Sequence, residues 1–164
     1  MSLAEAAATA DGLAQDGSER ELAQLRSQWG EELEAAARSS DYRERIVAYR
    51  AIGQFRFRQK LELLRRGLED ESPACRGAAL LSLELLSRDH PGDVNADRSL
   101  LHAIVSDGEE NAAVRRLAIA CLKNGSPQRD TIVILEGLAA NDDQDRELRA
   151  TARRVVELLK KKSR

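Results

Sequence analysis

The chain has 164 residues with a formal net charge of −2, and 42% of its residues are hydrophobic, 33% charged and only 3% aromatic. This balance, with Ala and Leu prominent, predicts one mostly helical domain with a real core, and it excludes a strongly basic nucleic-acid binder on overall charge alone. No apolar run approaches the roughly 18 residues of a membrane span, the N-terminus does not resemble a secretory signal and two Cys do not make a disulfide framework, so we expect a soluble, cytoplasmic protein.

The first 17 residues are rich in Ala and contain two Asp-Gly pairs, Asp11-Gly12 and Asp16-Gly17. Because Asp-Gly favours turns, we expect residues 1–17 to form a flexible N-terminal arm. A helix is predicted to begin near Ser18, a suitable N-cap with Glu21 three residues later. Its apolar residues recur at spacings of three and four and define one helical face: Leu22, Leu25, Trp29, Leu33 and Ala36.

Four later segments share one pattern around an Arg. Ala follows the Arg by three positions and an aliphatic residue follows it by seven, and both positions lie on one face of a helix. The Arg residues are separated by 31, 39 and 34 residues, and a helical period of this length is typical of a solenoid. The segments are RIVAYRAIGQF from Arg45, RGAALLSLELL from Arg76, RRLAIACLKNG from Arg115 and RATARRVVELL from Arg149.

An apolar helix and then an acidic turn are predicted before each of these Arg helices. A small residue recurs just before the last apolar position of each such helix. Since Gly inside a helix costs about 1 kcal/mol relative to Ala, its recurrence predicts that two helix backbones approach closely there. The small residues are Ala36, Gly67, Ala103 and Gly137.

The predicted helix boundaries carry residues that favour caps and breaks. Ser72-Pro73 and Ser126-Pro127 each place a capping Ser before a Pro at the first helical position, and Asn124-Gly125 is a good helix stop. We therefore expect an all-α protein, an α-solenoid (armadillo-like superhelix) whose second helices line a shallow concave surface. The single domain is expected over residues 18–164, with repeats at about 18–58, 59–92, 97–125 and 126–162.

This pattern resembles the HEAT repeat, and it is most similar to the short HEAT-like repeats of the phycobilisome-lyase type. That form has a Leu-rich helix, an Asp turn and then Val-Arg-x-x-Ala-x-x-x-Leu. AVRRLAIACL, from Ala113 to Leu122, is the closest match, while Cys75 and Leu148 take the Val position in two other segments. The resemblance covers about residues 22–160. It implies a protein or peptide partner, and this subtype adds a second HEAT-like subunit, a phycobiliprotein or a bilin as candidates.

An Arg at the start of each second helix can reach the acidic turn of its own or of the neighbouring repeat. We expect such pairs to form a structural ladder that fixes the register of the stacked repeats. A ligand-binding role for the Arg set is the alternative. The ladder consists of Arg45, Arg76, Arg115 and Arg149 with Asp41, Asp70, Asp107 and Asp142.

No catalytic or metal-binding constellation is predicted. Cys75 and Cys121 lie on or beside apolar faces in different repeats, and we expect both to be small core residues. His90 and His102 are distant from each other and from the cysteines in the sequence, so no zinc spacing is present.

The segment DVNADRS begins like a calcium loop, with Asp93, Asn95 and Asp97 at alternate positions. However, Arg98 stands where the turn needs Gly and Ile104 stands where the loop needs a bidentate Glu. We therefore expect a solvated loop without a cation.

Basic and aromatic residues alternate in QFRFRQKLELLRR, a pattern that some proteins use to hold nucleic acid or phosphate. The same pattern arises where a helix ends, Phe55 enters the core and a basic turn complements the helix C-terminus. We favour this structural interpretation. The segment contains Phe55, Phe57, Arg56, Arg58, Lys60, Arg65 and Arg66.

The predicted function is a non-catalytic protein-interaction module, namely an adaptor, scaffold or assembly chaperone that binds a protein or peptide on the concave face. One alternative is a bilin lyase or bilin-protein chaperone that acts on phycobiliproteins. The other is nucleic-acid binding, against which the few aromatics count. The predicted partner-binding residues lie off the buried face of the second helices: Tyr49, Arg50, Glu84, Arg116, Lys123 and Arg153.

Overall fold

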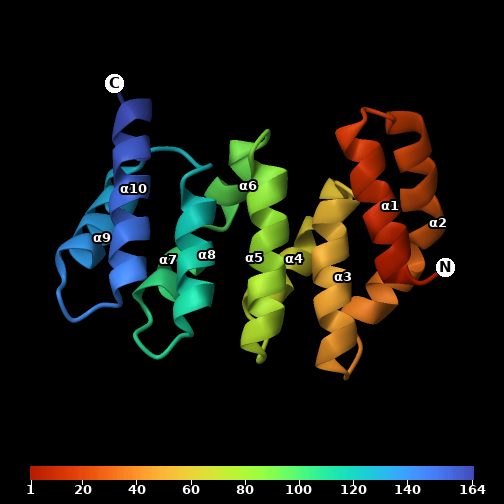
Figure 1. Ribbon diagram of the computed structural model, residues 1–164, viewed down its shortest axis with the longest axis horizontal. Helices are drawn as coiled ribbons and strands as arrows, with labels where there is room; N and C mark the ends of the chain where they lie inside the picture. Colours follow the sequence, from red (N-terminus) through yellow and green to blue (C-terminus); the bar gives the residue numbers. More distant parts are fainter. The chain divides into compact units, whose positions relative to one another are not determined.

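The computed structural model describes residues 1–164, which form ten α-helices, one short 3₁₀ helix and no strand (Figure 1). The chain is therefore all-α, as the sequence predicts, and its helices pack in pairs. The helices group into two compact units, Met1–Leu86 and Ser87–Arg164, where one repeat domain from residue 18 was expected. None of the helices is both long enough and apolar enough to cross a membrane.

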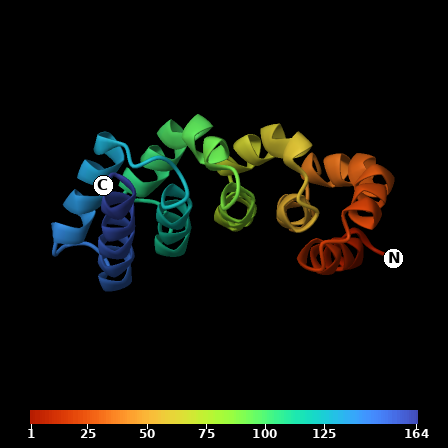
Figure 2. The same cartoon turned by 90° about the horizontal axis from the view of Figure 1, so that it is seen from above.

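The first unit contains two helix pairs. Helix α2 (Glu19–Ala37) packs against α3 (Tyr42–Gln54), and the 3₁₀ turn η1 (Arg58–Lys60) leads into α4 (Leu61–Leu68), which packs against α5 (Pro73–Ser87). Figure 2 shows α2 and α4 in one layer and α3 and α5 in the other. The first helices of the two pairs thus lie on one side of this unit, and the second helices lie on the other.

The second unit repeats this two-layer arrangement. Helix α7 (Arg98–Ser106) packs against α8 (Ala112–Leu122), and α9 (Arg129–Ala140) packs against α10 (Arg146–Lys162). Helices α8 and α10 are also in contact with each other, so the second helices again form one layer. A short helix, α6 (Pro91–Ala96), precedes α7.

The repeated sequence positions form the core of each pair. The Ala three residues after each Arg is completely buried in all four second helices, and the aliphatic residue seven after the Arg is at most 5% exposed. Because the first of these side chains is small, the two helices of a pair can approach closely. This confirms the predicted buried face, which consists of Ala48, Ala79, Ala118, Ala152, Ile52, Leu83, Leu122 and Val156.

The N-terminal segment corrects the prediction of a flexible arm. Residues Leu3–Gln15 form α1, whose buried side chains recur with helical spacing and pack against α2 and α3. Ala is the strongest helix former, and it outweighs the one Gly inside this helix. Only the second Asp-Gly pair breaks the helix, because Gly17 adopts a φ of 74° directly after it. The buried residues of α1 are Leu3, Ala6, Ala7 and Ala10.

The connection between the second and third repeats also differs from the expected solvated loop. It contains α6, and Val94 within this helix is completely buried. Asp93 and Asp97, two of the three candidate calcium ligands, are themselves buried, with 9% and 5% of their surface exposed. Pro91 at the first helical position starts this helix with a suitable φ.

Asn95 of α6 fixes the loop that precedes α9. Its side-chain Nδ2 donates to Ser126 Oγ at 2.8 Å, and its Oδ1 accepts from the Ser126 backbone N–H at 2.9 Å. Ser126 was predicted to cap a helix that begins at Pro127. Instead α9 begins at Arg129, because Ser126 is engaged by Asn95.

The small residues of the first helices mark a close approach at only one position. A Cβ atom on Gly67 would lie 2.8 Å from the Ala79 Cβ atom and 3.1 Å from the Tyr49 ring, as predicted. Gly137 has no atom within 4 Å of such a Cβ atom, and Ala103 is exposed. The prediction of a recurrent close approach is therefore wrong at these two positions, because the small residues face solvent there.

The closest backbone approach joins α3 and α5 at Gly53. A Cβ atom on Gly53 would lie 2.8 Å from the Cα atom of Ser82. The Ser82 hydroxyl accepts from the Gly53 N–H at 3.0 Å and donates to the Tyr49 carbonyl. These two backbone groups are the ones that an α-helix joins directly. The Ser82 hydroxyl of α5 thus stands between the N–H and carbonyl groups that would otherwise bond within α3. This close contact leaves no room for a Cβ atom at position 53 and therefore requires Gly.

Replacing Gly53 by Ala should lower the free energy of unfolding by about 1–3 kcal/mol, because the new methyl group overlaps the backbone of α5. Gly137→Ala is the matched control, and it should raise the free energy of unfolding by about 1 kcal/mol, since Ala is the better helix former in open space. Urea unfolding of both variants measures these changes. A Gly53→Ala variant as stable as the parent would disprove the close contact.

Candidate partner-binding surface

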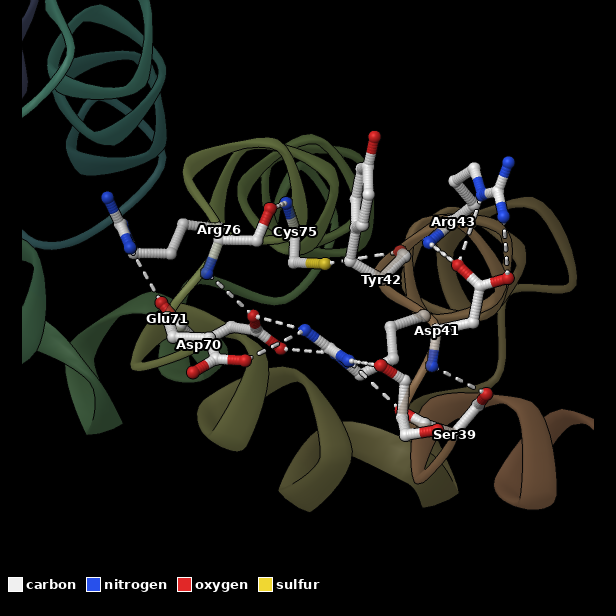
Figure 3. A network of polar contacts seen from close by, with 11 residues as sticks. Ser39, Asp41, Tyr42, Arg43, Asp70, Glu71, Cys75 and Arg76 are labelled. Carbon is white, nitrogen blue, oxygen red and sulfur yellow. Dashed lines mark hydrogen bonds and ion pairs between the residues drawn. The ribbon is translucent and has the colours of Figure 1, made fainter.

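Arg45 forms the most complete step of the predicted ladder. Its side chain is 11% exposed, and its Nε and Nη2 atoms donate to the two carboxylate oxygens of Asp70 at 2.9 and 3.2 Å. Its Nη1 atom donates to the carbonyl oxygens of Ser39 and Ser40 at 3.0 and 3.2 Å. One guanidinium therefore joins the turn of its own repeat to the acidic turn of the next repeat. Figure 3 shows Asp70 within this network, with Ser39 on one side and Arg76 on the other.

The charge of Asp70 is stabilised by its donors. Burial is the largest single influence on this carboxyl group and favours its neutral form, but the hydrogen bonds from Arg45 and from the Ser72 N–H outweigh burial and lower the pKa of Asp70. The Ser72 bond measures 2.9 Å. The hydrogen bonds to Asp70 in turn raise the pKa of Arg45. Both partners are thus held in their charged forms.

The Arg residues of the next two repeats use backbone carbonyl groups as acceptors. Arg76 Nη1 donates to the Asp70 carbonyl oxygen at 2.6 Å. Arg115 is 6% exposed, and its Nε and Nη2 atoms donate to the Val105 carbonyl oxygen at 3.0 and 2.8 Å. Its Nη1 atom donates to Gln144 Oε1 in the next turn at 3.0 Å. The last carbonyl groups of a helix lack partners within the helix, so Arg115 caps α7 at Val105, while Arg76 holds the turn that follows α4.

The remaining predicted acids do not all meet the Arg residues assigned to them. Arg149 contacts Asp142 at 3.4 Å, and the Asp142 side chain is 98% exposed. Asp41 instead pairs with Arg43 at 3.2 Å and caps α3, and hydrogen bonds from the Arg43 side chain and backbone lower the pKa of Asp41. Asp107 accepts from the backbone N–H of Glu109 at 2.9 Å. The ladder of Arg and Asp is therefore complete in one step only, between Arg45 and Asp70.

The basic and aromatic segment is held by contacts within the chain. Phe55 is completely buried, as predicted. Arg56 adopts a φ of 52° and its Nη1 atom donates to Asp11 Oδ1 at 2.8 Å and to the Gly53 carbonyl oxygen at 2.9 Å. Lys60 lies 5.3 Å from the centre of the Phe57 ring. These contacts support the structural interpretation of this segment over phosphate binding.

The candidate chemical residues are dispersed. Cys75 and Cys121 are completely buried, as predicted, and burial raises the pKa of the Cys75 thiol. His102 Nε2 lies 2.8 Å from Thr131 Oγ1, and burial lowers its pKa. No group of three or more His, Cys, Asp or Glu side chains is placed to hold a metal ion.

The predicted partner-binding residues differ widely in exposure. Tyr49 is only 4% exposed and packs against α4 at Gly67, so its predicted place at the solvent surface is wrong. The fourth position after the Arg is also buried at Leu80 and Ile119, and it is exposed only at Arg153. The other predicted residues, which are half-buried, are Arg50, Glu84, Arg116 and Lys123.

The outer face of the second helices includes the fifth and ninth positions after the Arg, which are half-buried or exposed in all four repeats. On α3 this face carries Val47 and Arg50, and on α5 it carries Leu81 and Leu85. Leu81 is 41% exposed although it lies in the middle of a helix whose opposite face is completely buried. The sequence analysis did not single out Leu81, because the repeat marks only the third and seventh positions after the Arg.

Three of the predicted charged residues on the second unit make contacts within the chain. Arg116 Nη1 lies 3.4 Å from Asp145 and 3.6 Å from Glu147 at the start of α10. The carbonyl oxygen of Lys123 accepts from Lys162 Nζ. Arg153 is exposed, and its Nη2 atom donates to the Ala139 carbonyl oxygen at 3.2 Å. These contacts fix the position of the charged groups and leave part of each exposed or half-exposed.

Residues 30–107 match the family described as HEAT repeats. The matched segment runs from within α2 to the end of α7, so it includes the step from Arg45 to Asp70. This segment is therefore similar to HEAT repeats, which are generally protein-interaction modules. The match is to HEAT repeats as a class and does not extend to the phycobilisome-lyase subtype. No curated protein and no solved structure matches the chain at a significant level.

Replacing Asp70 by Asn should lower the thermal midpoint by several degrees at neutral pH, because the largely buried Arg45 guanidinium loses its bidentate anion and keeps as an anion only the exposed Glu71 at 3.8 Å. The pKa of Asp70 is lower in the folded protein than its ordinary value. Its contribution to stability is therefore complete above the ordinary pKa of Asp, about 3.9, and is lost as the pH falls through the folded value. The difference between parent and variant should accordingly shrink below about pH 4.

Asp142→Asn is the matched control, since Asp142 is almost completely exposed. This change should alter stability by less than about 0.5 kcal/mol. Thermal unfolding followed by circular dichroism between pH 3 and pH 7 compares the two variants. Equal midpoints for both variants at neutral pH would contradict the structural importance of the Asp70 step.

Proposed function

We propose that this protein is a non-catalytic interaction module, an adaptor, scaffold or assembly chaperone, that binds a protein or an extended peptide on the exposed face of its second helices. The observation that carries the proposal is the exposed apolar side chain of Leu81 on this face. HEAT repeats commonly use stacked second helices as binding surfaces. The family match over residues 30–107 supports the same function class.

The neighbourhood of Leu81 supports a binding role. The adjacent Ser82 hydroxyl donates to the Arg50 carbonyl oxygen at 3.1 Å, so α3 and α5 meet at this level. Leu81 therefore lies beside the part of α3 that carries Arg50 and, one turn earlier, Val47. A single exposed Leu is ordinary, but an apolar centre beside an Arg has the composition typical of interface anchors.

The charged candidates belong to separate units. Glu84 contributes to the edge of the proposed surface of the first unit, near Leu81, whereas Arg116, Lys123 and Arg153 lie on or at the end of the second helices of the second unit, where they would contribute to a contact of that unit. Charged residues at an interface edge affect the rate of association and its salt dependence more than the final affinity. No observation favours bilin chemistry or nucleic-acid binding, since both cysteines are buried and Arg56 and Lys60 are engaged within the chain.

Replacing Leu81 by Ser should weaken partner binding by about tenfold or more, because the change removes the apolar centre of the surface. The partner is first identified by affinity capture with the parent protein and mass spectrometry, and the purified partner is then titrated against each variant. Arg50→Ala should weaken the same binding. Neither change should lower the free energy of unfolding by more than about 0.5 kcal/mol, since both side chains are at least partly exposed.

Val133→Ser is the matched control, because Val133 is 56% exposed on α9, a first helix. It removes a similar apolar side chain from the other layer and should leave the affinity unchanged. Unchanged affinity in both the Leu81 and the Arg50 variants would exclude this face as the binding surface. A loss in the Val133 variant alone would place the partner on the first helices.

A further inference from the structure

Opposite charges are concentrated in two separate helical parts of the chain. Residues 1–37, which form α1 and α2, contain eight acidic and two basic residues, a net charge of −6. Residues 146–164, which contain α10, have eight basic and two acidic residues, a net charge of +6. The whole chain has a net charge of only −2, so its near-neutrality conceals two strongly charged segments.

An open groove of about 560 Å³ lies in the first unit where the start of α1, the end of α2 and the start of α3 meet. Most of the residues that line the groove are apolar or small, and the charged residues lie at its edges. A volume of this size is sufficient for a few side chains of a docked helix. The apolar lining consists of Leu3, Ala4, Ala35, Ala36 and Val47.

The edges of this N-terminal groove carry acids without ion-pair partners. Glu32 and Glu44 line the groove and are exposed, and no basic side chain lies within ion-pair distance of either. The one base in the lining, Arg43, is already paired with Asp41 at 3.2 Å. The groove therefore presents an apolar floor between two uncompensated carboxylates.

The exposed face of α10 has the complementary character. Ala150, Arg154, Leu158 and Lys161 recur at spacings of three and four along this face, and all four are exposed. Leu158 is 40% exposed. Arg154 and Lys161 have no acid within ion-pair distance, while the opposite face of the helix is buried in the second unit. This stripe presents an apolar centre between two cations, which lie about 10 Å apart along the helix axis.

We propose that the α10 stripe of one copy docks into the N-terminal groove of a second copy. Leu158 and Ala150 contact the apolar floor, and Arg154 and Lys161 lie against Glu32 and Glu44. A second copy is the occupant because the chain itself supplies both a groove with acidic edges and a basic stripe with an apolar centre. The contact is heterologous, since the two surfaces differ, and such contacts produce head-to-tail chains or closed rings.

The size and charge of the contact determine its strength. A groove of this volume buries less surface than a stable dimer needs, so we expect weak association that becomes evident only at high protein concentration. Exposed ion pairs are screened by salt. The association should therefore weaken as the salt concentration rises.

Analytical ultracentrifugation of the full chain over a series of concentrations tests the proposal, first at low salt and then at about 0.5 M salt. The average mass should rise with concentration at low salt and fall back toward the monomer at high salt. A monomer at every concentration at low salt would overturn the proposal. The same result is expected if the stripe met the groove of its own chain or if the groove bound another protein.

Charge reversal identifies the two surfaces. Glu32→Lys with Glu44→Lys makes the groove basic, and Arg154→Glu with Lys161→Glu makes the stripe acidic. Each double variant alone should associate about tenfold more weakly or not at all, because like charges then meet. An equimolar mixture of the two should associate again, since each surface finds an opposite charge on the other variant. Failure of the mixture to associate would overturn the proposed pairing.

Glu21→Lys with Glu69→Lys is the matched control, because it makes the same change in net charge at exposed acids outside the groove. This variant should associate as the parent does. If it weakens association as much as the groove variant, net charge and not the groove governs the process, and the proposal fails. Circular dichroism establishes that every variant keeps the helical fold, and replacing the same four residues by Gln provides a milder series with the same expected order of effects.

Discussion

The turn between the two helices of a repeat determines how the second helix lies on the first, and one Arg side chain fixes that turn. The first helix ends with carbonyl groups that have no partners inside it, and a cation near this end is favoured by the helix dipole. From the second helix, Arg115 reaches back to such a carbonyl group at Val105, while Arg45 and Arg76 bind carbonyl oxygens of the turn that follows the first helix, at Ser39 and Asp70. Because the buried Ala and aliphatic positions follow the Arg at fixed intervals, fixing the Arg also fixes which face of the second helix enters the core.

Periodicity predicted this part of the fold well, because the burial of a helical residue depends mainly on its phase relative to its neighbours. It could not predict which atoms accept the Arg donors. Arg115 occupies the same position of the repeat as Arg45, yet it binds a carbonyl oxygen and Gln144 where Arg45 binds a carboxylate. The choice of acceptor depends on the path of the turn, and the turns differ in length and composition between repeats.

The remaining differences between the predicted and the observed structure arise from tertiary packing outside the repeated positions. Helix α1 and helix α6 are supported by contacts with other helices and loops, whereas their own sequences contain turn signals. Tyr49 was predicted at the surface because it lies off the main buried face, but Gly67 of the neighbouring helix leaves room for its ring. The sequence of one helix does not show the shape of the neighbouring surface that packs against it. The exposure of residues at the border of the buried face is therefore the hardest to predict.

The difference between the repeated positions and the positions that vary from repeat to repeat also concerns function. The buried positions are alike in every repeat and can therefore specify only the fold, which many functions share. The exposed positions differ: the fifth residue after the Arg is Arg50, Leu81, Ala120 and Arg154 in the four second helices. An exposed Leu in this series adds little to folding, because 41% of its surface remains in solvent. Under the proposed function, a partner bound across α3 and α5 would remove this surface from water, at a gain of about 25 cal/mol for each Å² of apolar surface buried.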